Sequence, residues 1–100
     1  MIVVSKISQN PTLIEQAERL SRNKRAQDDV NKLINQITQG NLNPEIGTRS
    51  VKTLRNVMEY RGKNKDRVYF KKVNQEIHIL AKSEKRNQKL VILTLKQMGY

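Results

Sequence analysis

The stretch VMEYRGKNKDRVYFKKVNQEIHILAK, residues 57–82, predicts three consecutive β-strands. Residues 57–61 and 67–72 alternate between apolar and polar side chains, and residues 77–82 are rich in β-branched residues, which are patterns typical of strands. The segments 62–66 and 73–76 between them have the composition of turns. We therefore expect three antiparallel strands joined by two short connections.

The pairing of these strands decides which charged side chains meet, because side chains alternate across a strand. The first turn places Arg61 opposite Arg67, and the second places Lys82 opposite Arg67 and His78 opposite Lys71. In this register one face of the sheet carries seven polar or aromatic residues: Glu59, Arg61, Arg67, Tyr69, Lys71, His78 and Lys82. We expect helices to cover the opposite, apolar face and leave this polar face open as the functional surface.

The residues before this stretch predict a short strand, residues 1–7, and two amphipathic helices. Asn10 followed by Pro11 predicts a helix start, because Asn caps helices and Pro fits the first helical position. The second helix ends near Gly40, a residue typical of helix C-termini, and residues 40–47 predict a loop. Apolar residues at helical spacing form the inner helix faces: Leu13, Ile14, Ala17, Leu20, Ala26, Val30, Leu33, Ile34 and Ile37.

The chain after the strands predicts a last helix that begins at Ser83 or Glu84. The sequence as a whole therefore predicts a single domain, residues 1–100, of the α+β class. Its expected element order is β-α-α-β-β-β-α. In this fold an antiparallel sheet has the two N-terminal helices packed on one face and a C-terminal helix.

The net charge is the most unusual number in the composition. The chain has 20 Lys and Arg against 9 Asp and Glu, a formal charge of +11. Residues 51–100 hold 13 basic and 4 acidic residues, so this half alone carries +9. A charge excess concentrated in one half predicts a polyanionic partner, either nucleic acid or an acidic protein.

The composition also excludes several classes of site. The chain has no Cys and one His, so disulfides, thiol nucleophiles and zinc sites built on Cys or clustered His are excluded. We expect no metal and no cofactor. No apolar run reaches the ~20 residues of a membrane helix, and residues 1–4 are too short for a signal-peptide core. We expect no membrane partner and a cytoplasmic protein.

The polar face suits a phosphodiester, because Arg presents a rigid fork and Lys a compact charge to phosphate oxygens. Cleavage of RNA by its own 2′-hydroxyl needs a base, an acid for the leaving oxygen and cations for the developing charge. Glu59 or His78 would act as base or acid, and Tyr69 would donate a proton or stack on a nucleobase. The cations of the same face would hold the charge: Arg61, Arg67 and Lys82.

Each of these residues also has a purely structural interpretation. His78 would be a surface residue, Glu59 would balance its cationic neighbours, and Tyr69 would be there because tyrosine favours sheets. Arg61 and Arg67 are harder to explain in this way, since like charges directly opposite each other destabilise a sheet.

Residues 82–89, KSEKRNQK, predict an anion site between the last strand and the last helix. A Ser hydroxyl, several cations and the free N–H groups of a helix start would meet there. A basic surface helix capped by Ser83 is the structural alternative, and the two are compatible. With one lysine of the polar face, this segment supplies the residues expected to contact RNA: Lys71, Ser83, Lys85 and Arg86.

Three segments resemble the RelE/ParE superfamily of bacterial toxins: Glu59-Tyr60-Arg61, Asp66-Arg67-Val68-Tyr69-Phe70, and residues 77–88, IHILAKSEKRNQ. Members of that superfamily have an Arg at the end of the second strand and an Arg-hydrophobic-aromatic third strand. Their hydrophobic fourth strand leads into a Lys/Arg-rich segment, and two helices precede the sheet. The resemblance covers about residues 50–92 by motif and the first 50 residues by architecture.

The resemblance implies a metal-independent endoribonuclease, commonly acting on messenger RNA in the ribosomal A site and silenced by an acidic cognate antitoxin. The third-strand Arg of the family falls on Arg67, the preceding Arg on Arg61, and the basic residue after the sheet on Lys85 or Arg86. Some members have a catalytic Tyr in the last helix, and its position corresponds to about Ile92, which is not a Tyr. Related toxin tips of the same wider fold are delivered between bacteria and neutralised by immunity proteins.

Two further functions stay open at this point. A gyrase-inhibiting toxin of the same superfamily would bind protein and cut no RNA. A basic nucleic-acid-binding module would bind phosphates without turnover, with a steep dependence on salt.

Overall fold

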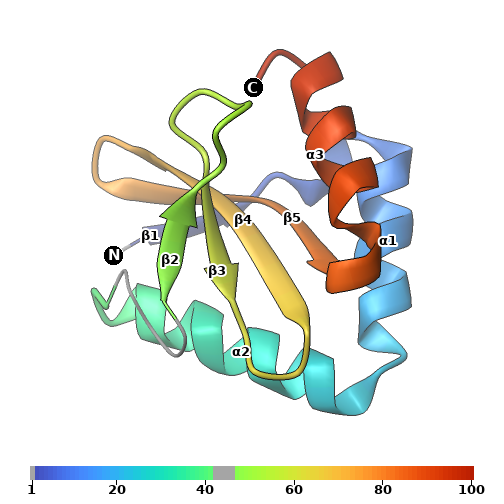
Figure 1. Cartoon of the computed structure of the whole chain (residues 1–100). Helices are drawn as coiled ribbons and strands as arrows, with labels where there is room; N and C mark the ends of the chain where they lie inside the picture. Colours follow the sequence, from blue (N-terminus) through green and yellow to red (C-terminus); the bar gives the residue numbers. More distant parts are fainter. Residues whose placement is uncertain (1, 42–46) are drawn as a thin grey trace.

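Five β-strands form one sheet in the order β1-β5-β4-β3-β2 in the computed structural model, which describes residues 2–41 and 47–100 (Figure 1). The strands are β1 (Ile2–Ser5), β2 (Thr48–Ser50), β3 (Met58–Arg61), β4 (Asp66–Val73) and β5 (Glu76–Glu84). The predicted α+β class and the three central strands are confirmed. Because β1 pairs with β5 in parallel, the sheet is mixed, and the prediction of an antiparallel sheet holds only for β2 to β5.

Three α-helices within the described residues pack on the sheet: α1 (Pro11–Ser21), α2 (Lys24–Thr38) and α3 (Gln88–Gln97). The Asn10 side chain accepts a hydrogen bond from the Thr12 N–H at 2.8 Å, with Pro11 at the first position, which confirms the predicted cap. Gly40 follows α2 with a φ of +93°, as its place after the helix requires. Of the predicted loop at 40–47, residues 42–46 lie outside the described residues.

The last helix begins later than its sequence predicts. Strand β5 continues to Glu84, a 3-10 turn η2 (Lys85–Asn87) follows, and α3 starts at Gln88. Ser83 is not a helix cap, because its backbone pairs with Arg67 and its hydroxyl contacts Tyr69.

Both faces of the sheet carry a hydrophobic core, so the prediction of an open polar face is wrong. On one face, α2 packs against the sheet through a cluster that includes Val30, Leu33, Val68 and Phe70. On the other face, α3 supplies Val91 and Leu95, which pack with Leu13, Tyr69, Leu80 and Ala81. Helix α1 lies beside β5 and contributes Leu13 to one cluster and Leu20 to the other (Figure 1), so the two N-terminal helices do not share one face.

A β-bulge changes the predicted register of β4 and β5. Arg61 lies opposite Arg67 and His78 opposite Lys71, as predicted. Between these pairs Tyr69 faces Ala81 and Phe70 faces Ile79, so Leu80 is one extra residue. Lys82 therefore pairs with Val68 rather than Arg67 and turns to the α2 face.

Two carboxyl groups are buried together beside Gly62. Asp29 of α2 is 2 % exposed and Asp66 of β4 is 0 % exposed, and a Cβ atom at Gly62 would collide with the Oδ2 atoms of both. Burial, followed by the adjoining Asp29 carboxyl group, raises the pKa of Asp66 to about 7. The Asp66 carboxyl group is therefore protonated below that pH.

Candidate functional site

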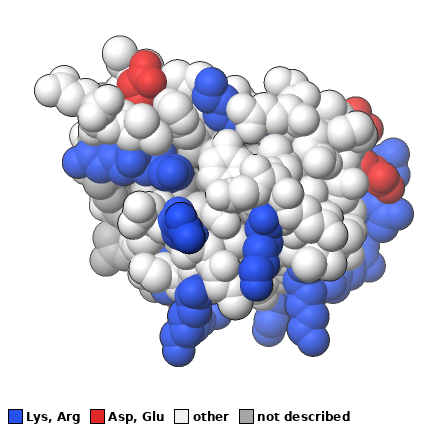
Figure 2. Space-filling model, turned by 90° about the horizontal axis from the view of Figure 1, so that it is seen from above, with Lys and Arg blue, Asp and Glu red and all other residues white. Residues whose placement is uncertain are grey.

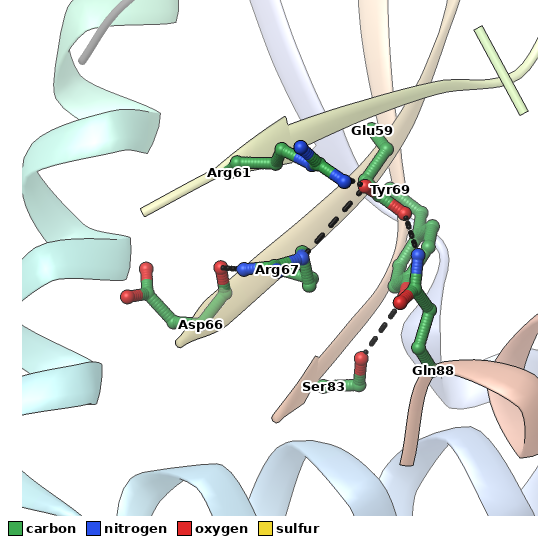
Figure 3. Close-up of polar contacts among 7 residues, drawn as sticks. All are labelled: Glu59, Arg61, Asp66, Arg67, Tyr69, Ser83 and Gln88. Carbon is green, nitrogen blue, oxygen red and sulfur yellow. Dashed lines mark hydrogen bonds and ion pairs between the residues drawn. The ribbon is translucent and has the colours of Figure 1, made fainter. Parts of the chain in front are cut away.

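Glu59 in β3 is a buried carboxylate that receives donors from three elements (Figure 3). Its Oε1 atom lies 3.3 Å from Nε of Arg61 and 3.7 Å from Nε of Arg67. Its Oε2 atom accepts a 2.7 Å hydrogen bond from the Gln88 amide at the start of α3. Strand alternation places Glu59 and Arg61 on one face, and the β3–β4 register adds Arg67.

This contact explains how two arginines can face each other in a sheet. Arg61 and Arg67 are directly paired across β3 and β4, an arrangement that destabilises a sheet unless it is compensated. The Glu59 carboxylate lies between them and supplies the compensating charge. The structural interpretation of Glu59 is thus confirmed, and it is compatible with a chemical role.

The two arginines differ in their access to solvent. Arg67 is 6 % exposed, and one of its terminal nitrogens donates to the Asp66 backbone carbonyl at 2.9 Å. About a third of the Arg61 side chain, 34 %, is exposed. Of the two, Arg61 is therefore the guanidinium that can contact a ligand directly. Arg67 is buried and contacts the Glu59 carboxylate inside the protein.

A cleft of about 250 Å³ opens over Glu59 between α3 on one side and β2 with the residues after it on the other. The residues lining this Glu59 cleft are Arg49, Ser50, Val51, Lys52, Thr53, Glu59, Gln88 and Ile92. Arg49 lies directly opposite Glu59 in the β2–β3 register, so Arg49 and Lys52 form a cationic rim around one carboxylate. The cleft is smaller than the ~300–1,000 Å³ of typical small-molecule pockets and suits a segment of a polymer better than an enclosed metabolite.

Sequence reasoning missed Arg49 and Gln88. Arg49 belongs to a strand of three residues, which is too short to show an alternating pattern. Gln88 is an ordinary polar residue in a basic segment, and nothing in its sequence context indicates a contact with a residue 29 positions earlier.

Three predicted catalytic residues do not line the cleft. Tyr69 lies directly opposite Glu59 in the β3–β4 register but is fully buried. Its hydroxyl lies 3.1 Å from Oγ of Ser83, and burial raises its pKa. Lys82 is on the opposite face of the sheet, where burial lowers its pKa. His78 contacts Glu76 at 3.1 Å near the β4–β5 turn, three residues along β5 from Ala81, which is roughly 10 Å of strand.

The residues predicted to contact RNA are also separated. Lys71 lies near that same turn, with Nζ 5.9 Å from the centre of the Tyr100 ring, and Ser83 is buried. Lys85 and Arg86 are exposed in η2, at the end of β5. Of these four, Lys85 and Arg86 are exposed. They follow closely after Ser83, the strand partner of Arg67.

Most of the surface visible in Figure 2 is uncharged (white), Lys and Arg (blue) are spread over it, and Asp and Glu (red) lie near its margins. Within residues 2–41 and 47–100, no group of three or more Asp, Glu or His side chains is arranged to hold a metal ion. No helix in this described part has the length and apolar character of a membrane span.

Comparison of the chain with protein-family models, curated proteins and solved structures finds no match.

Proposed function

We propose that the protein is an endoribonuclease toxin that cleaves RNA at the Glu59 cleft without a metal ion. The observation that carries this proposal is a carboxylate held by two guanidinium groups at the floor of a cleft with a cationic rim. The charge of +11 supports a polyanionic substrate. The resemblance of residues 50–92 to RelE/ParE toxins supports RNA as that substrate.

The contacts of Glu59 suggest how the reaction proceeds. Its Oε2 atom accepts a hydrogen bond from the Gln88 side-chain amide. An RNA 2′-hydroxyl would replace Gln88 as the donor to this oxygen. Glu59 accepts the hydroxyl proton while the 2′-oxygen attacks phosphorus and the bond to the 5′-oxygen breaks. The products are a 2′,3′-cyclic phosphate and a 5′-hydroxyl, whose oxygen takes a proton from solvent. Arg61 binds the charge that develops on the phosphate.

This mechanism gives His78 no role. We expect His78→Ala to change kcat/KM for an RNA oligonucleotide by less than about twofold. His78 lies roughly 10 Å along β5 from Ala81, the residue that Tyr69 connects to Glu59 across the sheet. The pH–rate profile, measured from about pH 5.5 to about pH 8.5, is expected to have the same shape for both proteins, with no contribution from an imidazole. A tenfold loss in the variant would place His78 in the reaction.

The proposed substrate is messenger RNA, on the ribosome or free, in the cytoplasm of the affected cell. An acidic antitoxin or immunity protein is the proposed inhibitor, because neutralising the basic rim of the cleft requires a negatively charged partner.

Expression in bacteria tests this function directly. We expect the wild-type protein to stop growth and to create new RNA 5′ ends, and Arg61→Ala to do neither, because it removes the exposed guanidinium. Removing one such charge-stabilising donor typically costs about 10²–10³ in rate. Arg25→Ala is the matched control, since Arg25 is exposed on α2, and it should retain both effects.

The outcomes of this experiment separate the functions. Growth arrest with intact RNA and broken DNA would replace the ribonuclease with a gyrase-inhibiting toxin. An Arg61→Ala protein that arrests growth and cuts RNA like the wild type would contradict the proposed site.

A further inference from the structure

A second basic surface lies where β5 ends and η2 begins, just before Gln88 of the Glu59 cleft in the sequence, and the cleft does not account for it. It consists of two adjoining hollows, one lined by Lys65, Glu84, Lys85 and Arg86, and the other by Arg19, Arg22, Asn23, Glu84 and Arg86. Because Glu84 and Arg86 line both, the hollows form one continuous surface, which we name the flanking surface. Its residues come from three parts of the chain: the end of α1, the turn before β4, and the end of β5 with η2.

The flanking surface carries a large excess of positive charge. Its lining contains five cations and one carboxylate, Glu84. Glu84 is paired with Arg86 at 3.2 Å, and Arg19 is paired with Glu15 at 3.6 Å. Among the described residues, no ion pair engages the other three cations, Arg22, Lys65 and Lys85.

The flanking surface adjoins the three strand partners Arg61, Arg67 and Ser83, which lie side by side across β3, β4 and β5. The Lys85 N–H donates to the Lys65 carbonyl at 2.7 Å, which fixes η2 against the turn before β4. Lys85 follows Ser83 by two residues, and Ser83 is the strand partner of Arg67. At the rise of an extended chain this is a distance of roughly 7 Å, so the positive charge continues from the arginine pair onto the flanking surface.

We infer that the flanking surface binds the RNA backbone on one side of the cleaved bond, an inference that rests on the proposed ribonuclease function. Every side chain lining the two hollows is charged or polar, and none is aromatic. Cations without stacking platforms bind phosphates rather than bases. The flanking surface therefore holds the substrate strand without reading its sequence, and it favours longer RNA over short fragments.

The test uses a triple variant, Arg22→Gln/Lys65→Gln/Lys85→Gln, because these three exposed cations have no ion pairs to lose. The matched control is Lys32→Gln/Lys72→Gln/Lys96→Gln, three exposed lysines outside the flanking surface with the same loss of charge. The probe is a single-stranded 2′-O-methyl RNA of about 16 nucleotides, which has no free 2′-hydroxyl and cannot be cleaved. Binding is measured across a range of salt concentrations.

We expect the triple variant to bind this RNA at least about tenfold more weakly than the control variant at moderate salt. The slope of log K against log salt should fall by about 2, because each lost phosphate contact removes about 0.7. Cleavage of a dinucleotide that spans only the Glu59 cleft should be unchanged. Affinities of the two variants within twofold, or no RNA binding by the wild-type protein, would overturn the inference and leave an acidic protein as the partner of this surface.

The probe also separates this inference from the proposed function. If no protein in the series cleaves RNA but the triple variant alone loses affinity, the ribonuclease is wrong, and the part of the inference that stands is RNA binding by the flanking surface. If cleavage occurs and long and short RNAs are cut equally well by both variants, the ribonuclease stands and the flanking surface is wrong.

Discussion

Replacement of Glu59 by Gln is expected to reduce RNA cleavage by about 10²–10⁴-fold, the usual contribution of a general base. Gln has nearly the same shape but cannot take a proton from the 2′-hydroxyl. The same change should also lower the stability of the protein by about 3 kcal/mol, since it leaves the buried Arg67 beside Arg61 without a counter-ion. Cleavage of a defined oligonucleotide and urea unfolding, measured on the same preparations, give the two effects separately.

Glu59→Asp is the matched control for this prediction. Asp keeps the charge between Arg61 and Arg67, so most of the stability should remain, while its shorter side chain moves the carboxylate away from the cleft and slows cleavage. Cleavage is to be measured at urea concentrations and temperatures where each variant is folded. A folded Gln variant that cuts RNA at more than a tenth of the wild-type rate would restrict Glu59 to its structural role.

Replacement of Asp29 by Asn is expected to stabilise the protein at about pH 8 by on the order of 1–2 kcal/mol. In the wild type the pKa of Asp66 is raised from 3.8 to about 7, so the folded protein binds a proton that the unfolded chain has already lost. The contribution of Asp66 to the free energy of unfolding is therefore greatest below about pH 4 and falls as the pH rises to about 7. The Asp29→Asn change removes the neighbouring charge and introduces an amide that can donate a hydrogen bond to Asp66, so the fall should become shallower, although burial of Asp66 keeps part of it.

Urea unfolding at about pH 4.5, 6 and 8 measures this slope. Asp28→Asn, on the same helix but exposed, makes the same change in charge and should leave the slope unchanged. Equal slopes in the wild type and the Asp29→Asn protein would show that Asp29 does not raise the pKa of Asp66.

Local patterns predicted much of the fold. Asn10 and Pro11 determine the start of α1 through their own hydrogen-bonding and backbone properties, so the helix boundary was readable. The pairing of Arg61 with Arg67 followed from alternation on either side of a short turn. The bulge at Leu80 was not readable, because it depends on the packing of that side chain against α1 and α3.

The candidate site was predictable to the extent that it lies within one hairpin. Glu59, Arg61 and Arg67 belong to β3 and β4, whose register is local, and the structure brings them together. Lys82 was placed wrongly because one extra residue in β5 moves it to the other face. Gln88 and the cleft itself depend on where α3 lies over the sheet, which is a tertiary contact that periodicity does not encode.

The parallel pairing of β1 with β5 has a consequence for biosynthesis. The two strands join residues 2–5 to residues 76–79, so the sheet has a high contact order and cannot be completed early in translation. The cleft additionally needs Gln88 and Ile92 of α3. During translation the cleft therefore stays unassembled until Gln88 and Ile92 have left the ribosome. If the cleft is the source of toxicity, the nascent chain is harmless until that point.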